Sequence, residues 1–103
     1  MVITVKINRR DIISFDGVCL VNVTALNHDD SVRRIFRLYK TETDFVAERI
    51  DDPTTIDVRF WGARCEDTDS IYEFFGNEPL ANYLYGSLQL AVPGLCHSST
   101  PVG

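Results

Sequence analysis

The chain has 103 residues, of which 45% are hydrophobic and 24% charged, and its formal net charge is −5. These values exclude an intrinsically disordered chain, and we expect one globular domain that buries roughly two-thirds of its unfolded surface. No stretch approaches the roughly eighteen apolar residues of a membrane-spanning helix. The first ten residues alternate apolar with polar side chains, where a signal peptide would have a continuous apolar run.

The charges are segregated along the chain. Residues 1–41 have seven cations against four carboxylates, which gives a net charge of +3. Residues 42–78 have eleven carboxylates against three cations, which gives −8, and residues 79–103 contain no charged side chain. This polarity is the most distinctive feature of the sequence, and it bears on association with partners.

The first quarter of the chain predicts strands. Apolar and polar residues alternate over residues 2–7, which is the pattern of a strand with one face on a core. Two further apolar runs, 12–15 and 18–26, flank Asp16 and Gly17. Because Asp-Gly between apolar runs favours a type I′ turn, we expect these two runs to form a hairpin.

Residues 32–50 can be interpreted in two ways. Val32, Ile35, Phe36 and Tyr39 fit the spacing of an amphipathic helix, with Asp30 as an N-cap. Alternatively, residues 35–40 and 45–50 are two strands joined by the polar turn 41–44. We favour the hairpin because the segment is rich in aromatic and β-branched residues.

The remaining elements complete an α+β fold. We expect a strand over residues 55–63, a helix capped by Asp69 and ended by Gly76, and a helix from Pro79 to Gly86. Alternation over residues 87–92 predicts a last strand. The sequence thus predicts a mainly antiparallel β-sheet of five to seven strands, with a short helical pair before the last strand. Residues 1–93 form a single domain and residues 94–103 a flexible tail.

The cysteines favour a reducing compartment. Cys19, Cys65 and Cys96 are an odd number without close pair spacing, which is not a secreted disulfide framework, so we place the protein in the cytoplasm. Cys19 falls on the apolar face of its predicted strand and is expected in the core. Cys65 precedes two carboxylates, which disfavour a reactive thiolate.

Nothing in the sequence identifies an enzyme. There are two histidines, His28 and His97, and neither has a recognisable catalytic partner or motif. Cys96 and His97 with Cys65 and His28 lack the paired spacing of a zinc site, so no metal and no cofactor is expected. An enzyme that uses Asp57 and Glu73 as acid and base is an alternative without further support. We therefore expect a non-enzymatic protein.

A cluster of cations gives one hypothesis for a ligand site. Arg33, Arg34, Arg37 and Lys40 would suit phosphate, so a small-ligand or nucleotide-binding homo-oligomer is the alternative function. A domain of net charge −5 is repelled by a polyanion, so direct nucleic-acid binding is not expected. We instead expect these cations to pair with carboxylates of residues 42–52.

The acidic block supports the function that we favour, a small acidic binding protein that masks or inhibits a cationic protein surface. Small acidic domains without a catalytic site are typical of inhibitors that phages or plasmids direct at nucleic-acid-handling defence complexes such as CRISPR-Cas, and of toxin-immunity proteins. The expected partner is a basic protein or nucleoprotein rather than a membrane, and a homodimer is compatible with the sequence. The predicted partner-binding residues are carboxylates with nearby aromatic anchors: Glu66, Asp67, Asp69, Glu73, Glu78, Trp61 and Tyr72.

Overall fold

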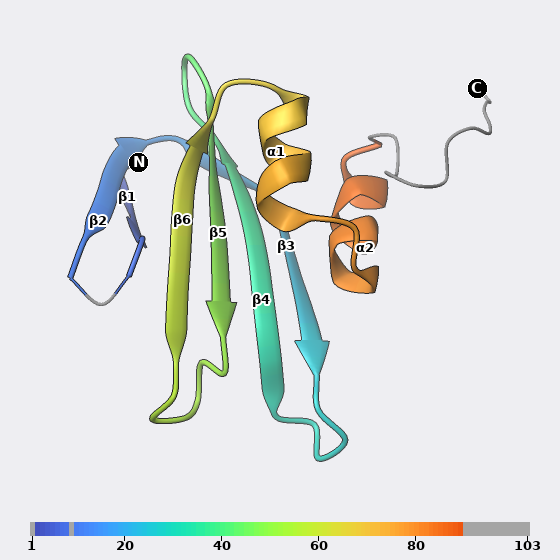
Figure 1. Ribbon diagram of the computed structural model, residues 1–103. Helices are drawn as coiled ribbons and strands as arrows, with labels where there is room; N and C mark the ends of the chain where they lie inside the picture. Colours follow the sequence, from blue (N-terminus) through green and yellow to red (C-terminus); the bar gives the residue numbers. More distant parts are fainter. Residues whose placement is uncertain (1, 9, 90–103) are drawn as a thin grey trace.

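The computed structural model describes residues 2–8 and 10–89 as six strands followed by two helices (Figure 1). The strands form two antiparallel sheets, one of β1 and β2 and one with the order β3-β4-β5-β6. The α+β class and the predicted number of strands are confirmed, but the strands are divided between two sheets. The bounds are β1 Val2–Lys6, β2 Ile12–Asp16, β3 Val18–Leu26, β4 Val32–Lys40, β5 Phe45–Asp51, β6 Arg59–Cys65, α1 Thr68–Phe75 and α2 Pro79–Ser87.

The centre of the larger sheet is the hairpin of β4 and β5, which confirms the favoured interpretation of residues 32–50. Arg37 lies opposite Glu48 in this register. The polar turn is closed by Thr41, whose amide donates to the carbonyl of Asp44 at 3.0 Å and whose hydroxyl accepts from the Asp44 amide at 2.9 Å. These bonds give the backbone groups of the turn their partners. The flanking residues, which prefer strands to helices, can therefore pair as a hairpin.

The predicted hairpin around Asp16 and Gly17 is wrong. Strand β2 pairs with β1, and β3 pairs with β4, so the chain crosses from one sheet to the other at Gly17. A side chain at Gly17 would collide with the main-chain carbonyl of Lys40. The glycine is therefore needed for close backbone approach and not for a type I′ turn.

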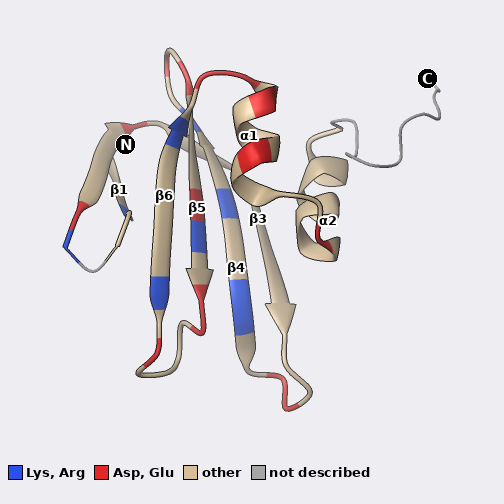
Figure 2. Cartoon of the chain, in the orientation of Figure 1, with Lys and Arg blue, Asp and Glu red and all other residues tan. Residues whose placement is uncertain are grey.

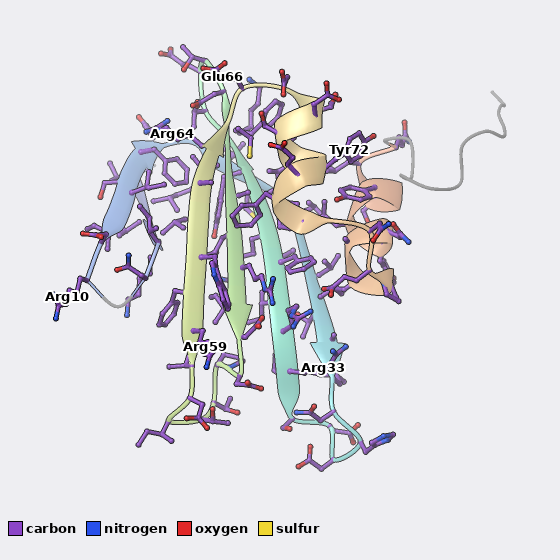
Figure 3. All side chains as sticks on the ribbon, viewed as in Figure 1. Arg10, Arg33, Arg59, Arg64, Glu66 and Tyr72 are labelled. Atoms are coloured by element: carbon purple, nitrogen blue, oxygen red, sulfur yellow. The ribbon has the colours of Figure 1, made fainter. Side chains whose placement is uncertain are left out.

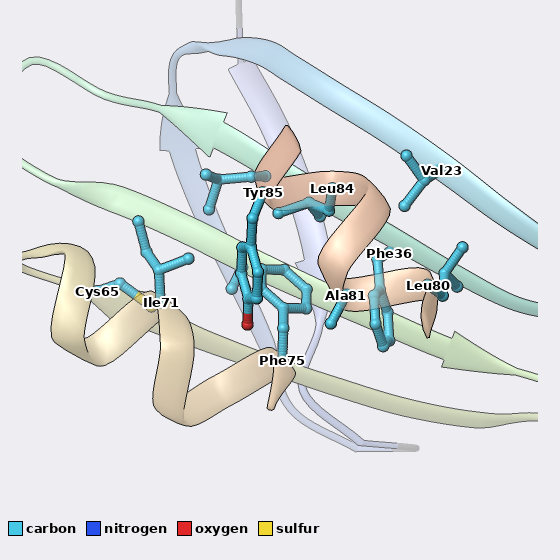
Figure 4. Packing of buried hydrophobic residues seen from close by; sticks show 11 residues of the cluster. Val23, Phe36, Cys65, Ile71, Phe75, Leu80, Ala81, Leu84 and Tyr85 are labelled. Atoms are coloured by element: carbon cyan, nitrogen blue, oxygen red, sulfur yellow. The ribbon is translucent and has the colours of Figure 1, made fainter. Parts of the chain in front are cut away.

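The two helices cover one face of the four-stranded sheet, with α1 against β5 and β6 and α2 against β3 and β4 (Figure 1). Alternate residues of β4 point into this layer, and the Phe36 ring lies 4.8 Å from that of Phe75. Each large side chain buried here contributes roughly 1.5–3 kcal/mol to folding. The buried cluster contains Val23, Phe36, Leu38, Ala47, Cys65, Ile71, Phe75, Leu80, Ala81, Leu84 and Tyr85 (Figure 4).

The hairpin of β1 and β2 packs on the opposite face of the sheet. Val5 and Phe15 form a second buried cluster there with Tyr39 and Val46. The Phe15 and Tyr39 rings meet edge to face at 5.4 Å. Gly62 of β6 permits the close approach of β1 to the sheet, because a Cβ at that position would lie 2.8 Å from a methyl carbon of Val5. The molecule thus has three layers: helices, sheet and hairpin.

The boundaries of the last elements differ from the sequence prediction. Strand β6 begins at Arg59 rather than residue 55, because residues 52–58 form turns in which the Thr55 amide donates to the carbonyl of Asp52. Helix α1 is capped by Asp67, two residues before the predicted cap, and Gly76 ends it with φ of 77°, as predicted. Among the described residues, no helix has the length and apolar character to cross a membrane.

The predicted placement of the helices before the last strand is wrong, since both follow β6. Ser87 continues α2 past Gly86, and the Leu88 amide donates to the carbonyl of Leu84 at 3.2 Å. Helical hydrogen bonding therefore overrides the alternation that starts at Ser87. The rest of that predicted strand, residues 90–92, and the predicted tail, residues 94–103, lie outside the described residues.

Replacing Gly17 with alanine tests the close approach at the crossover. Gly17→Ala should destabilise the protein by about 1–3 kcal/mol, because its Cβ has no room beside Lys40. Gly86→Ala is the control, since a Cβ there meets nothing within 4 Å and alanine favours the helix. Urea denaturation measures both, and equal midpoints for wild type and Gly17→Ala would contradict the packing.

Candidate binding surface

Four of the predicted carboxylates lie together on α1 and the turn before it: Glu66, Asp67, Asp69 and Glu73. We call them the α1 acidic surface (Figure 2). All four are exposed. No ion pair in the described part of the chain involves them, so their charge is available to a partner.

Local folding requirements place two of these carboxylates. Asp67 caps α1 by accepting a hydrogen bond from the Ser70 amide at 2.9 Å. Hydrogen bonds from the Ser70 amide and hydroxyl lower the pKa of Asp67, which keeps the cap ionised. Asp69 lies in the first turn, where the helix dipole favours a negative charge.

Glu78 does not belong to this surface. It lies at the start of α2, where both its carboxylate oxygens accept from Nη1 of Arg34 at 2.7 and 2.6 Å. Nε of Arg34 also donates to Asp51 Oδ1 at 2.8 Å. Glu78 therefore ties α2 to β4, and its predicted role in partner binding stays a prediction.

The same network reaches Trp61. Asp51 also accepts from Arg49, at 3.1 and 2.9 Å, and the Arg49 guanidinium lies 4.4 Å from the centre of the Trp61 ring. Burial acts to raise the pKa of Asp51, but hydrogen bonds from Arg49 and Arg34 outweigh it, so the pKa lies below its ordinary value. Trp61 remains 36% exposed, so one side of its ring is held by arginine and the rest faces solvent.

Tyr72 is held by the core rather than standing free on α1. Its ring meets Tyr85 edge to face, with centroids 4.8 Å apart. Burial, and then the nearby charge of Asp69, raises the pKa of Tyr72. Figure 3 shows the side chain between the two helices, so only part of the ring can reach a partner.

The four cations of β4 do not form one site. Alternation along the strand places Arg34 and Lys40 on the helix face and Arg33 and Arg37 on the other. Arg34 binds Asp51 and Arg37 binds Glu48, which confirms the expected pairing with carboxylates of residues 42–52. Lys40 lies over the Phe45 ring at 5.0 Å, and Arg33 is exposed near the other end of the sheet (Figure 3). A phosphate site made of all four cations would need their side chains on one face, whereas the strand places two of them on each face.

The sequence analysis missed Glu48, whose carboxylate is buried. The Tyr39 hydroxyl donates to Glu48 Oε1 at 2.8 Å, and Arg37 donates to the same oxygen at 3.2 Å. Burial, and then the Glu48 hydrogen bond, raises the pKa of Tyr39 well above its ordinary value. The signal in the sequence was the apolar setting of Glu48 between Val46 and Ile50 on the same strand face.

The cysteines differ from one another in environment. Cys65 is buried, and burial followed by the charges of Asp44 and Asp67 raises its pKa to about 11, so it is a poor nucleophile at neutral pH. Cys19 is exposed rather than in the core, because a bulge between Cys19 and Val21 turns it to the other face of β3. Both thiols are free.

The other candidate residues are dispersed. His28 lies in the exposed turn after β3, while Asp57 lies in the loop before β6 and Glu73 on α1. Within residues 2–8 and 10–89, no three histidines, cysteines or carboxylates are grouped as metal ligands. Cys96 and His97 lie outside these ranges, so the expected absence of a zinc site stays a prediction.

Comparison of the chain with models of protein families, with curated proteins and with solved structures finds no match. The surface is therefore interpreted from its own geometry.

Removing the Arg34 guanidinium tests the network between β4 and α2. Arg34→Met should destabilise the fold by about 2 kcal/mol, because Asp51 and Glu78 lose charge-assisted hydrogen bonds in a half-buried setting. Arg33→Met is the matched control, since this neighbour is exposed and surface changes of this kind usually stay within about 0.5 kcal/mol. Urea denaturation measures the difference, and equal losses in the two variants would contradict the network.

The same variant has a predicted pH dependence. The pKa of Asp51 is lower in the folded state than its ordinary 3.8, so its stabilisation is complete above that pH and is lost as the pH falls through the folded pKa. The stability difference between wild type and Arg34→Met should therefore be constant above about pH 5 and shrink as the pH falls below about 4. A difference that does not shrink in acid would show that the Asp51 charge contributes nothing.

Proposed function

We propose that this chain is a non-enzymatic binding protein whose α1 acidic surface covers a cationic surface of a partner protein. The observation that carries the proposal is the contrast between two sets of carboxylates. Asp44, Glu48, Asp51 and Glu78 are held by arginines within the fold. The four carboxylates of the α1 acidic surface have no arginine partner among the described residues, and they lie together, whereas other exposed carboxylates such as Glu42 and Asp57 are scattered over the loops.

The surroundings of α1 supply contacts that charge alone does not. Glu73 and Phe74 of α1 border a recess of about 310 Å³ with Ala63 and Arg64 of β6. The charge of Arg64 is balanced by Asp44, with which it forms an ion pair. Trp61 lies two residues before Ala63, on the same face of β6. Aromatic side chains dominate binding energy at interfaces, while charge complementarity mainly accelerates the encounter. A basic side chain of the partner can enter the recess beside Glu73, with Trp61 as an anchor.

Two protein classes fit this activity: mobile-element inhibitors of nucleic-acid-handling defence complexes, and immunity proteins that neutralise nuclease toxins. Both act by covering a basic surface that otherwise holds nucleic acid, for which a carboxylate surface is a substitute. Two free thiols, at Cys19 and Cys65, suit action in the cytoplasm. We place this protein in that functional group.

Charge reversal on α1 tests the proposal. Asp69→Lys with Glu73→Lys leaves the Asp67 cap in place and should weaken partner binding at least tenfold, because attraction becomes repulsion. Asp11→Lys with Asp57→Lys is the control, since it changes the net charge equally at exposed carboxylates of the β1–β2 turn and of the loop before β6, away from α1. Partners captured on tagged wild-type chain from the source cells are purified, and their affinity for each variant is measured by calorimetry.

Salt supplies an independent readout of the same binding. Wild-type affinity should fall as ionic strength rises, because salt screens the exposed carboxylates. A partner that binds the α1 variant as tightly as wild type would refute the proposed surface. A partner that is lost equally with both variants would show dependence on net charge alone.

A further inference from the structure

The outer edge of β3 is a second surface with a different chemistry. Within the described residues, β3 pairs with β4 alone, so it is the edge of the sheet opposite β6 (Figure 1). Its nine residues, VCLVNVTAL, include neither a charged residue nor proline. Monomeric proteins usually protect an edge strand with charges, proline or a covering element, because its unpaired backbone groups are a template for another strand.

Several exposed side chains of β3 are large and apolar. Val18 is 59% exposed, Leu20 45% and Leu26 54%. Register shifts between Cys19 and Val21 and between Ala25 and Leu26 interrupt the pairing with β4 near the two ends of the strand, and such irregularities are a protective feature of edge strands. The residues after Leu20 still form a regular strand as far as Ala25.

Helix α2, which packs beside β3, extends this uncharged region. Residues 79–89 contain no charged side chain. Thr24 and Ala25 border a recess of about 290 Å³ with Tyr83 of α2, whose ring is 70% exposed. Arg33 and Glu78 also border the recess, and their charges are opposite. This side of the molecule therefore has no net charge to select a charged partner.

The opposite edge is different. Strand β6 carries Arg59 and Arg64, and α1 with its acidic surface packs against β5 and β6. Two copies joined through β6 would bring the arginines of both β6 strands, and the acidic surfaces of both α1 helices, close to one another. Two copies joined through β3 would leave both acidic surfaces at the far edges, where their mutual repulsion is weakest.

We propose that two copies of this chain pair through β3 to form a continuous eight-stranded antiparallel sheet. A two-fold axis sets a strand against its own reverse, so the strand must be complementary to itself. Because β3 has no charged residue, its pairing with a second copy brings no like charges of the strand together at any register. The axis of an antiparallel pair is perpendicular to the sheet, so the helix layers of both copies lie on the same face and the two α2 helices become neighbours.

Hydrodynamic mass tests the dimer, because one chain has a mass of 11.7 kDa. Wild type at micromolar concentration should sediment with about twice that mass. Leu20→Lys should raise the dimer dissociation constant at least tenfold, since self-pairing would desolvate two added charges at the interface. Val2→Lys is the matched control, because it adds the same charge at an exposed apolar residue of β1 and should leave the dimer intact.

Thr24→Lys is a second edge variant that keeps the test decisive if Leu20→Lys does not fold. Hydrogen exchange gives a direct readout, because β3 amides should become more protected as wild-type concentration rises, whereas β6 amides should not. A wild-type chain that sediments as a monomer at high micromolar concentration would overturn the proposal. So would a dimer that the folded edge variants leave unchanged.

Discussion

The hydrogen bonds that the Asp51 carboxylate accepts from two arginines hold together the polar side chains on the helix-covered face of the sheet. They come from Arg34 and Arg49, and these arginines reach onward to Glu78 and Trp61. This network thereby crosses β6, β5 and β4 and ends at Glu78, the N-cap of α2. Each member has a partner, as a half-buried charge requires. The carboxylates of the α1 acidic surface stay outside this network, and none of them is paired with an arginine in the described residues.

Local patterns in the sequence were sufficient for several elements of the fold. The polar turn between β4 and β5, the glycine that ends α1 and the proline that begins α2 were all identified from residues within a few positions. The failures were not local. Asp16 and Gly17 have the composition of a hairpin turn, but the sheet that each flanking strand joins depends on distant β1 and β4. The bulge that exposes Cys19 is equally invisible to an alternation rule.

The candidate surface was also predicted only where it depends on residues that are close in the sequence. Glu66, Asp67, Asp69 and Glu73 are neighbours along the chain, so a helix start was enough to bring them together. Glu78 is nearly as close in sequence, yet a strand residue far from it, Arg34, takes up its charge. The pairing of Arg37 with the buried Glu48 likewise required the strand register. Composition identified the charges, whereas tertiary contacts decided which of them remain available.

The hairpin of β1 and β2 is a separate sheet, joined to the rest through the crossover at Gly17 and held by the contacts around Val5 and Phe15. No backbone ladder in the described residues connects the two sheets. The hairpin can therefore detach as a cooperative unit while the four-stranded sheet and its helices stay folded. Such an opening admits water to Tyr39 and to the carboxylate of Glu48. The contacts around Val5 and Phe15 therefore set the free energy of this opening.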